Sequence, residues 1–296
     1  MIIATLIAAG RLDRDSIWQA ATCLEDARLK LGEWTWIDEG DAADIEVKGG
    51  AFELAQARAA LDGRLADVDF VVQPAAEREK KLLVADMDST MIGQECIDEL
   101  ADYAGAKAAV AAITEQAMRG QLDFAAALRD RVAVLEGLDA EVIDRCRTER
   151  VRANPGAKLL VSTMRARGAA TLLVTGGFTA FAEPVAAELG FEQVRANRLG
   201  IAGGRLSGLV EGPIVDAAAK RAALIELRDA FGLSAAQTLA IGDGANDRFM
   251  VEEAGLGIAF RAKPALASAA DARIDHNDLT ALLWVQGISR QAWVEA

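Results

Sequence analysis

Histidine and cysteine are scarce in this chain, and their scarcity removes several kinds of active site. His276 is the single histidine among 296 residues and lies in a polar Asp-His-Asn-Asp segment. A three-histidine zinc site is therefore excluded, a Ser–His–Asp triad is excluded in practice, and His276 is predicted to be structural. Cys23, Cys96 and Cys146 fit neither a zinc motif nor a disulfide framework, which indicates the reducing cytoplasm.

Basic charge, long apolar runs and a nucleotide-binding loop are also missing. The chain carries 32 basic and 45 acidic residues, a net charge of −13, which argues against a nucleic-acid partner. No apolar run approaches the roughly 20 residues of a membrane helix. The apolar start MIIATLIAAG has no basic flank and is predicted to be a strand rather than a signal peptide. There is no G-x-x-x-x-G-K-[ST] loop, so a P-loop ATPase is not expected.

The most informative segment that is present runs LLVADMDST, from Leu82 to Thr90. Its apolar half predicts a buried strand, which ends at the carboxylates Asp86 and Asp88. Ligands of open α/β folds bind at such strand ends. Two adjacent acids repel each other unless a cation or a shared proton offsets their charge, and Mg²⁺ prefers carboxylate and phosphate oxygens. The alternative interpretation is a solvated turn.

Two later strand ends repeat this pattern. A predicted strand ending at Val174 is followed by Thr175 and two glycines, whose backbone N–H groups and hydroxyl can bind phosphate oxygens. The alternative there is a plain loop before a helix. A strand ending at Ile241 is followed by the acids Asp243 and Asp247, and two such strand ends can share a single Mg²⁺.

Lys220 is the candidate cation of the site. A lysine near the start of a helix is usually a solvated surface residue. Lys220 gains a role because phosphoryl transfer needs a fixed positive charge to balance the phosphate and an attacking carboxylate.

The order of predicted elements divides the chain. Residues 1–75 follow the order βαββαβ, which predicts a ferredoxin-like α+β domain, and residues 73–81 are predicted to be a linker. A helical stretch follows Asp88, with Gly105, Gly120 and Gly137 between its expected helices. From Pro155 strands alternate with helices, which predicts a parallel sheet covered on both faces. The chain is therefore expected to be an α/β protein.

The segments DMDST, VTGG and GDGAND, with Lys220 between the last two, resemble the haloacid dehalogenase superfamily of phosphotransferases. The further match of Glu95 and of Arg131 in the helical stretch resembles the phosphoserine phosphatases. The resemblance covers residues 77–290 and implies a Rossmann-like catalytic domain at 77–296 with a helical-bundle cap at 93–150. Residues 1–75 resemble the ACT-like domain of some bacterial members, which implies amino-acid sensing.

This resemblance assigns the chemistry to named carboxylates. It implies that Asp86 forms an aspartyl-phosphate and that Asp88 serves as general acid and then general base. It implies a Mg²⁺ ion held by Asp86, the backbone carbonyl of Asp88 and Asp243, with Asp247 supporting the metal site from behind.

The remaining implied roles concern substrate binding. The phosphoryl group would be held by Thr175, Gly176, Lys220 and Asn246. The substrate would be O-phospho-L-serine, with its amino group on Glu95 and its carboxylate on Arg131. Thr175 stands where the family pattern leads us to expect serine, and it keeps the hydroxyl but adds a methyl group.

Three points stay open from the sequence. The same chemistry could serve another small phosphomonoester or transfer phosphate to an acceptor. The chain could instead be a ligand-sensing protein with an inactive catalytic domain, although intact acids argue against this. The sequence also does not decide whether the chain forms a homodimer.

Overall fold

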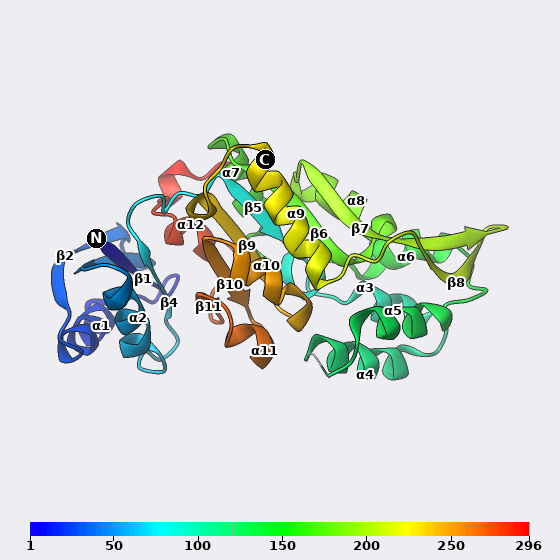
Figure 1. Ribbon diagram of the computed structural model, residues 1–296, viewed down its shortest axis with the longest axis horizontal. Coiled ribbons are helices and arrows are strands. Elements are labelled where there is room, and N and C mark those ends of the chain that lie inside the picture. Colours follow the sequence, from blue (N-terminus) through cyan, green and yellow to red (C-terminus); the bar gives the residue numbers. More distant parts are fainter. Residues whose placement is uncertain (120, 296) are drawn as a thin grey trace.

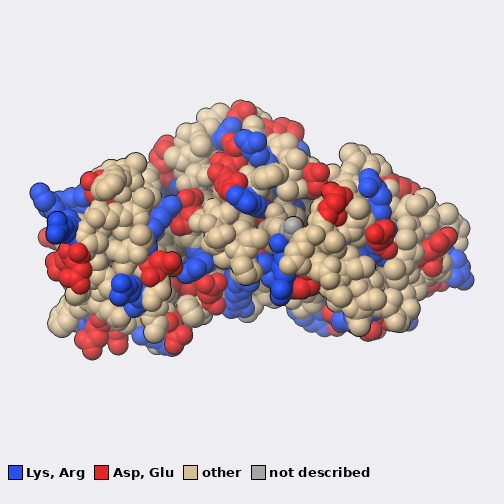
Figure 2. Space-filling view, turned by 60° about the horizontal axis from the view of Figure 1, so that its bottom comes forward, with Lys and Arg blue, Asp and Glu red and all other residues tan. Residues whose placement is uncertain are grey.

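The computed structural model describes residues 1–119 and 121–295. The expected Gly120 position between two helices lies outside the described residues. Two sheets organise the molecule: a small one at the N-terminal end and a larger one in the middle, with a helical layer beyond it (Figure 1). On the face shown in Figure 2, acidic and basic side chains are interspersed across the whole molecule.

The N-terminal unit has the predicted ferredoxin-like topology. Its four strands are antiparallel in the order β2-β3-β1-β4, with both helices packed on the sheet. Asp13 begins the first helix by accepting a hydrogen bond from the Ser16 N–H. The elements are β1 (Ile2–Ile7), α1 (Arg14–Asp26), β2 (Lys30–Asp38), β3 (Ala42–Lys48), α2 (Ala51–Leu61) and β4 (Asp69–Pro74).

The central sheet has seven strands in the order β11-β10-β9-β5-β6-β7-β8, all parallel except the last pair. This confirms the predicted mostly parallel α/β core. The strands are β5 (Leu82–Ala85), β6 (Ala170–Phe178), β7 (Gln193–Ala202), β8 (Arg205–Glu211), β9 (Thr238–Gly242), β10 (Leu256–Phe260) and β11 (Ala272–Ile274).

Helices cover both faces of this sheet, which explains why β5 is apolar at every position. Leu82 and Val84 pack with α9 and α10, whereas Leu83 and Ala85 belong to the larger core with α7, α8 and α12. These helices are α7 (Ala157–Ala166), α8 (Thr179–Leu189), α9 (Ala217–Ala230), α10 (Arg248–Glu253), α11 (Pro264–Ala267) and α12 (Ala281–Val285).

Four helices inserted after β5 form a cap over one end of the sheet: α3 (Cys96–Asp102), α4 (Lys107–Met118), α5 (Phe124–Ala133) and α6 (Glu141–Arg150) (Figure 1). The β7–β8 hairpin extends beneath the cap, where the Gly137 N–H donates to the Leu206 carbonyl. The two segments that connect the cap to the sheet lie side by side, because Ile92 before α3 pairs with Ala153 after α6 in an isolated β-bridge.

Two local expectations need correction. The prediction that a strand ends at Val174 is wrong, because β6 continues to Phe178 with a shift in its pairing to β7 between Val174 and Phe178. The prediction of a linker at residues 73–81 is also wrong in part. Gln73 lies in β4 and donates to the Val285 carbonyl, and Arg78 is held in the junction between the two sheets.

That junction is polar and largely buried. Arg78 donates to both oxygens of Asp44, at 2.6 Å and 2.9 Å, and to the Trp284 carbonyl. Asn277 accepts from the Ala9 N–H and donates to the Ile7 carbonyl and to Asp69. Arg78 thus joins β3 to Trp284, and Asn277 contacts residues at and just after the end of β1 and at the start of β4.

Among the described residues, no helix is both long enough and apolar enough to cross a membrane.

Candidate active site

Three acidic side chains meet where β5 and β9 end. These strands are neighbours in the sheet, and they place one carboxylate oxygen each of Asp86, Asp243 and Asp247 within 4.8 Å of one another. All three side chains are buried. The chain reverses its direction of progress across the sheet at β5, which is the position where open α/β folds bind ligands. The predicted convergence of the two acidic strand ends is thus present.

Lys220 is part of this cluster and not a solvated surface residue. It lies in the first turn of α9, fully buried, with Nζ 2.6 Å from Asp86 Oδ1 and 2.6 Å from Asp247 Oδ1. Asp247 Oδ2 accepts from the N–H groups of Asp243 and Gly244, which fixes its orientation. Among the described residues, nothing donates to Asp86 Oδ2, so this oxygen remains for chemistry or for a metal.

The electrostatics of the cluster call for more positive charge than Lys220 supplies. Burial, followed by the charge of Asp247, raises the pKa of Asp86 to about 7, although Lys220 opposes the shift. Burial also raises the pKa of Asp243 well above its usual range, and the charge of Glu95 adds to the rise. Three buried acids against one lysine are a donor set of hard oxygens that a divalent cation would neutralise. The residues present therefore fit a divalent metal site.

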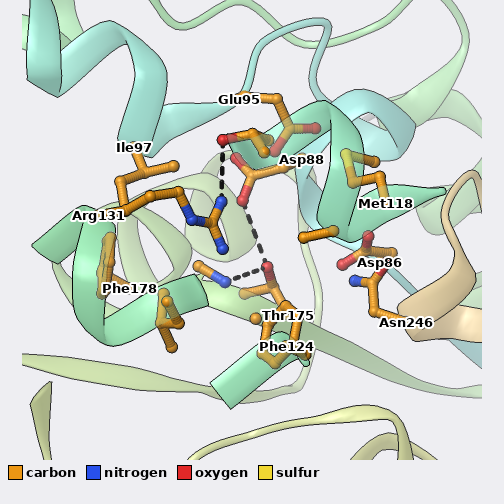
Figure 3. Close-up of a pocket in the computed structure, with 15 residues that line it drawn as sticks. Asp86, Asp88, Glu95, Ile97, Met118, Phe124, Arg131, Thr175, Phe178 and Asn246 are labelled. Carbon is orange, nitrogen blue, oxygen red and sulfur yellow. Dashed lines mark hydrogen bonds between the residues drawn. The ribbon is translucent and has the colours of Figure 1, made fainter. Parts of the chain in front are cut away.

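Asp88 points to the other side of the strand end, toward the cap (Figure 3). Its Oδ1 accepts from the Cys96 N–H at the start of α3, at 3.0 Å, and its Oδ2 lies 3.5 Å from Thr175 Oγ1. Ser89, directly after Asp88, adopts a φ of 53°, in the left-handed region. Burial raises the pKa of Asp88, which favours its protonated form.

The glycine pair after Thr175 lies against this carboxylate. A Cβ atom on Gly177 would come within 2.6 Å of Asp88 Oδ2, so a larger residue would displace the acid. The Gly177 N–H donates to Thr175 Oγ1 at 2.8 Å, and Asn197 Nδ2 donates to the Gly176 carbonyl at 2.7 Å. Asn197 was not predicted, and its place in β7 carries no local signal for this contact.

The cap supplies Glu95 and Arg131, and both line the cavity. Ser89 Oγ donates to Glu95 Oε1 at 2.5 Å, and burial raises the pKa of Glu95 well above its usual range. Arg131 is buried in α5, and Figure 3 shows its guanidinium on the same side of the cavity as Asp88 and Glu95. Asn246 lies beside Asp86, and its Oδ1 is buried with no hydrogen-bond partner among the described residues.

A cavity of about 40 Å³ lies between the sheet and the cap. Apolar side chains that the sequence did not single out line its cap side: Ile97, Met118, Phe124 and Leu128. The cavity is much smaller than the roughly 300–1,000 Å³ typical of ligand pockets. At about 10–15 Å³ of such volume for one water molecule, the cavity has room for about three water molecules.

His276 lies far from these groups, in the junction of the two sheets. Its backbone N–H donates to Asp69, whereas its ring is 41% exposed. Its ring Nδ1 lies 3.7 Å from Asp67 Oδ1, and the structural role of this side chain stays a prediction.

Comparison with known proteins agrees with this geometry. A model of haloacid dehalogenase-like hydrolases matches residues 83–252, which is more than half of the chain and contains every strand end described above. The chain belongs to the haloacid dehalogenase-like hydrolases. The resemblance drawn from the strand ends and Lys220 is confirmed.

Individual relatives narrow the position of this hydrolase. Phosphoserine phosphatase SerB2 of Mycobacterium tuberculosis is 45% identical over 241 residues, covering 81% of this chain and 58% of that protein. A structure titled as a phospho-aspartyl intermediate analogue of phosphoserine phosphatase has a TM-score of 0.67 at 38% identity and covers 69% of this chain and 98% of its own. The resemblance to phosphoserine phosphatases is confirmed.

One solved structure also matches the N-terminal unit. The haloacid dehalogenase family hydrolase t0658 from Salmonella enterica subsp. enterica serovar Typhi has a TM-score of 0.80 at 26% identity, covering 96% of this chain and 97% of that one. The hydrolase described here spans 58% to 63% of the length of the first curated relatives it matches.

Proposed function

We propose that this hydrolase removes phosphate from O-phospho-L-serine to give L-serine, through an aspartyl-phosphate intermediate. The observation that carries the proposal is the pairing of two chemistries around one cavity. Asp86, Asp88 and Lys220 can transfer a phosphoryl group, and Glu95 and Arg131 face it from the cap. The names of its relatives support the same substrate.

Asp86 is the proposed nucleophile. Lys220 holds its Oδ1 at 2.6 Å and favours the charged form, which leaves Oδ2 to attack phosphorus. Attack forms the bond between Oδ2 and phosphorus and breaks the bond between phosphorus and the seryl oxygen. Water then attacks the same phosphorus and releases Asp86.

Asp88 is the proposed proton carrier in both steps. Its raised pKa favours a proton on the carboxyl group at the outset, which Asp88 gives to the departing seryl oxygen. The resulting carboxylate can accept a proton from the attacking water. The Cys96 N–H holds Oδ1 throughout, so Oδ2 is the oxygen that exchanges the proton.

A divalent metal, which we propose to be Mg²⁺, would be held by Asp86, the backbone carbonyl of Asp88 and Asp243. When bound, it would neutralise the charge of the transferring phosphoryl group. Asp247 belongs to the same cluster of three acidic side chains. Its Oδ1 accepts from Lys220, and its Oδ2 accepts from two backbone N–H groups. These contacts support its proposed role as an orienting residue behind the metal.

The remaining side chains are proposed to bind the phosphoryl, ammonium and carboxylate groups of the substrate. Thr175, the Gly176 N–H, Lys220 and Asn246 are the proposed phosphoryl contacts, and Asn246 would donate from its Nδ2 group, because phosphoryl oxygens accept hydrogen bonds. Glu95 would accept the substrate ammonium, and Arg131 can grip its carboxylate with two parallel N–H groups. We also propose that the reaction takes place in the cytoplasm. The proposed domain limits are residues 1–75 and 77–296, with the cap at residues 93–150.

The decisive experiment is phosphate release from O-phospho-L-serine by the purified chain, with Mg²⁺ and with EDTA, beside a panel of small phosphomonoesters. Mg²⁺-dependent release with phosphoserine well ahead of the panel supports the proposal. Release from other esters with phosphoserine among the poorest would keep the aspartyl-phosphate chemistry and overturn the roles of Glu95 and Arg131. No release from any ester would overturn the catalytic proposal.

A further inference from the structure

Other cap residues hold the guanidinium of Arg131 through two of its three nitrogens. Its Nε donates to the Ala127 carbonyl one turn earlier in α5, at 3.0 Å, and its Nη1 donates to Thr114 Oγ1 at 2.9 Å. Among the described residues, its Nη2 donates no hydrogen bond, and the residue lines the cavity. The Nη2 group is thus the nitrogen that remains for a ligand.

Thr114 in α4 connects this arginine to an acid on a third helix. Its hydroxyl lies 2.6 Å from Asp98 Oδ1 and 3.1 Å from the Val110 carbonyl. A hydroxyl has one hydrogen to donate, and the shorter contact is to the carboxylate. The hydroxyl therefore donates to Asp98 and accepts from Arg131, so its orientation is fixed from both sides.

The Thr114 hydroxyl lies between the Asp98 carboxylate and the Arg131 guanidinium, so the two charged groups do not contact each other directly. No carboxylate within the described ranges forms a direct ion pair with Arg131, which keeps its positive charge available. Asp98 follows Glu95 by three residues at the start of α3. The same helical turn therefore carries Glu95, the proposed acceptor for the substrate ammonium, and Asp98, which holds Arg131 through Thr114.

We propose that Thr114 and Asp98 are positioning residues that aim the free Nη2 group of Arg131 at a carboxylate on the substrate, and so set the preference for an amino-acid phosphate. This inference rests on the proposed function. The three residues come from α3, α4 and α5, so the preference depends on how the cap helices pack and not only on the arginine.

The test compares two substrates that differ at the carboxylate: O-phospho-L-serine and phosphoethanolamine, which keeps the amine and lacks the carboxylate. Thr114→Val should raise KM for phosphoserine about tenfold, as expected for loss of one hydrogen bond to a charged group, with kcat changed little. KM for phosphoethanolamine should stay unchanged. Thr114→Ser restores the hydroxyl and should behave as the wild type.

Thr148→Val is the matched control, because this threonine makes a similar bond to the carbonyl four residues earlier on an exposed face of α6. Should Thr114→Val fail to fold, Asp98→Asn keeps an acceptor for the hydroxyl, removes the charge, and should raise KM for phosphoserine alone. Equal changes in KM for both substrates, or Thr114→Ser as impaired as Thr114→Val, would overturn the inference.

Arg131→Ala measured in parallel separates the two levels of the argument. A selective loss in Arg131→Ala with none in the Thr114 and Asp98 variants would overturn this inference and leave the proposed function standing. No selective loss in Arg131→Ala would overturn the proposed role of Arg131 itself, and this inference with it.

Discussion

Lys220 Nζ lies 2.6 Å from Asp86 Oδ1 with both side chains buried, although the two residues are 134 positions apart in the chain. The same ammonium group lies 2.6 Å from Asp247. One cation therefore opposes two acids, and any change to it leaves two carboxylates without their partner in a site shielded from water.

Lys220→Met should lower both activity and stability. Removing one partner of a buried ion pair costs about 3–5 kcal/mol, so the free energy of unfolding in urea should fall by that order. Phosphate release should fall at least about a thousandfold, because the charge beside the nucleophile is lost. The double variant Lys220→Met/Asp247→Asn should recover part of the stability and none of the activity. Activity within tenfold of the wild type would rule out the assigned role of Lys220.

Asp86→Asn should abolish turnover and leave the fold intact. The raised pKa of Asp86 means that its ionised form is disfavoured in the metal-free protein, so a neutral amide should not lower the melting temperature in EDTA. The increase in melting temperature on adding Mg²⁺ should disappear, since a ligand stabilises only the state it binds. Asp229→Asn, an exposed acid paired with Arg228, is the control. Retained turnover in Asp86→Asn would refute the nucleophile assignment.

Arg131→Ala should raise KM for phosphoserine far more than for an aryl phosphate whose aryl group is uncharged. The guanidinium is buried in the cap and is proposed to read only the carboxylate of the substrate. Steady-state kinetics on the two substrates measures the difference directly. Equal losses on both would mean that the arginine supports the cap without reading the carboxylate.

Asn277→Ala should destabilise the junction between the two sheets. Its side chain serves the Ala9 N–H, the Ile7 carbonyl and Asp69, and each buried group left unsatisfied costs about 1–3 kcal/mol. The urea midpoint should fall as a single transition. His276→Ala, at the neighbouring exposed ring, should change neither the midpoint nor phosphate release. Two separate transitions in the wild type would show that the junction does not couple the domains.

Lys80 gives the pH dependence of stability a defined sign. Its Nζ donates to the carbonyls of Glu77 and Ala236, and burial lowers its pKa to about 8. Between about pH 8 and pH 10 the unfolded chain keeps a proton that the folded chain has released, so stability should rise with pH. Urea unfolding at pH 7 to 10 should show this rise relative to Lys80→Met. Parallel curves for the two proteins would contradict it, and Lys81→Met, at the partly exposed neighbour that pairs with Glu79, is the control.

Much of the site follows from local sequence, and the reason is geometric. Asp86, Asp243 and Thr175 each follow an apolar run, and parallel strands bring such ends to one edge of a sheet. No apolar run precedes Lys220 in this way, so the sequence pattern does not predict its position; its burial depends on how α9 packs over the sheet. Its assignment came from the chemistry of phosphoryl transfer and from family resemblance.

Other features were beyond the reach of sequence patterns because they depend on distant partners. Asn197, Thr114 and Met118 lie in ordinary strand or helix positions, and their contacts with the site arise only from packing. The extension of β6 past Val174 reflects tertiary pairing that outweighs two glycines. The region predicted as a linker is held by Arg78 and Gln73, whose partners lie more than 200 residues later in the chain, besides Asp44 and Thr5.

The hydrogen bonds between Asn277 and the N-terminal unit have a consequence for biosynthesis. Ile7 and Ala9 receive their Asn277 contacts only after the ribosome has added 270 and 268 further residues, respectively. At about 5–20 residues per second, the N-terminal strands wait roughly 15 seconds to a minute for this partner. During that interval the nascent ferredoxin-like unit exposes a polar and apolar face that the finished protein covers. Newly made chains are therefore expected to depend on chaperones at this face in particular.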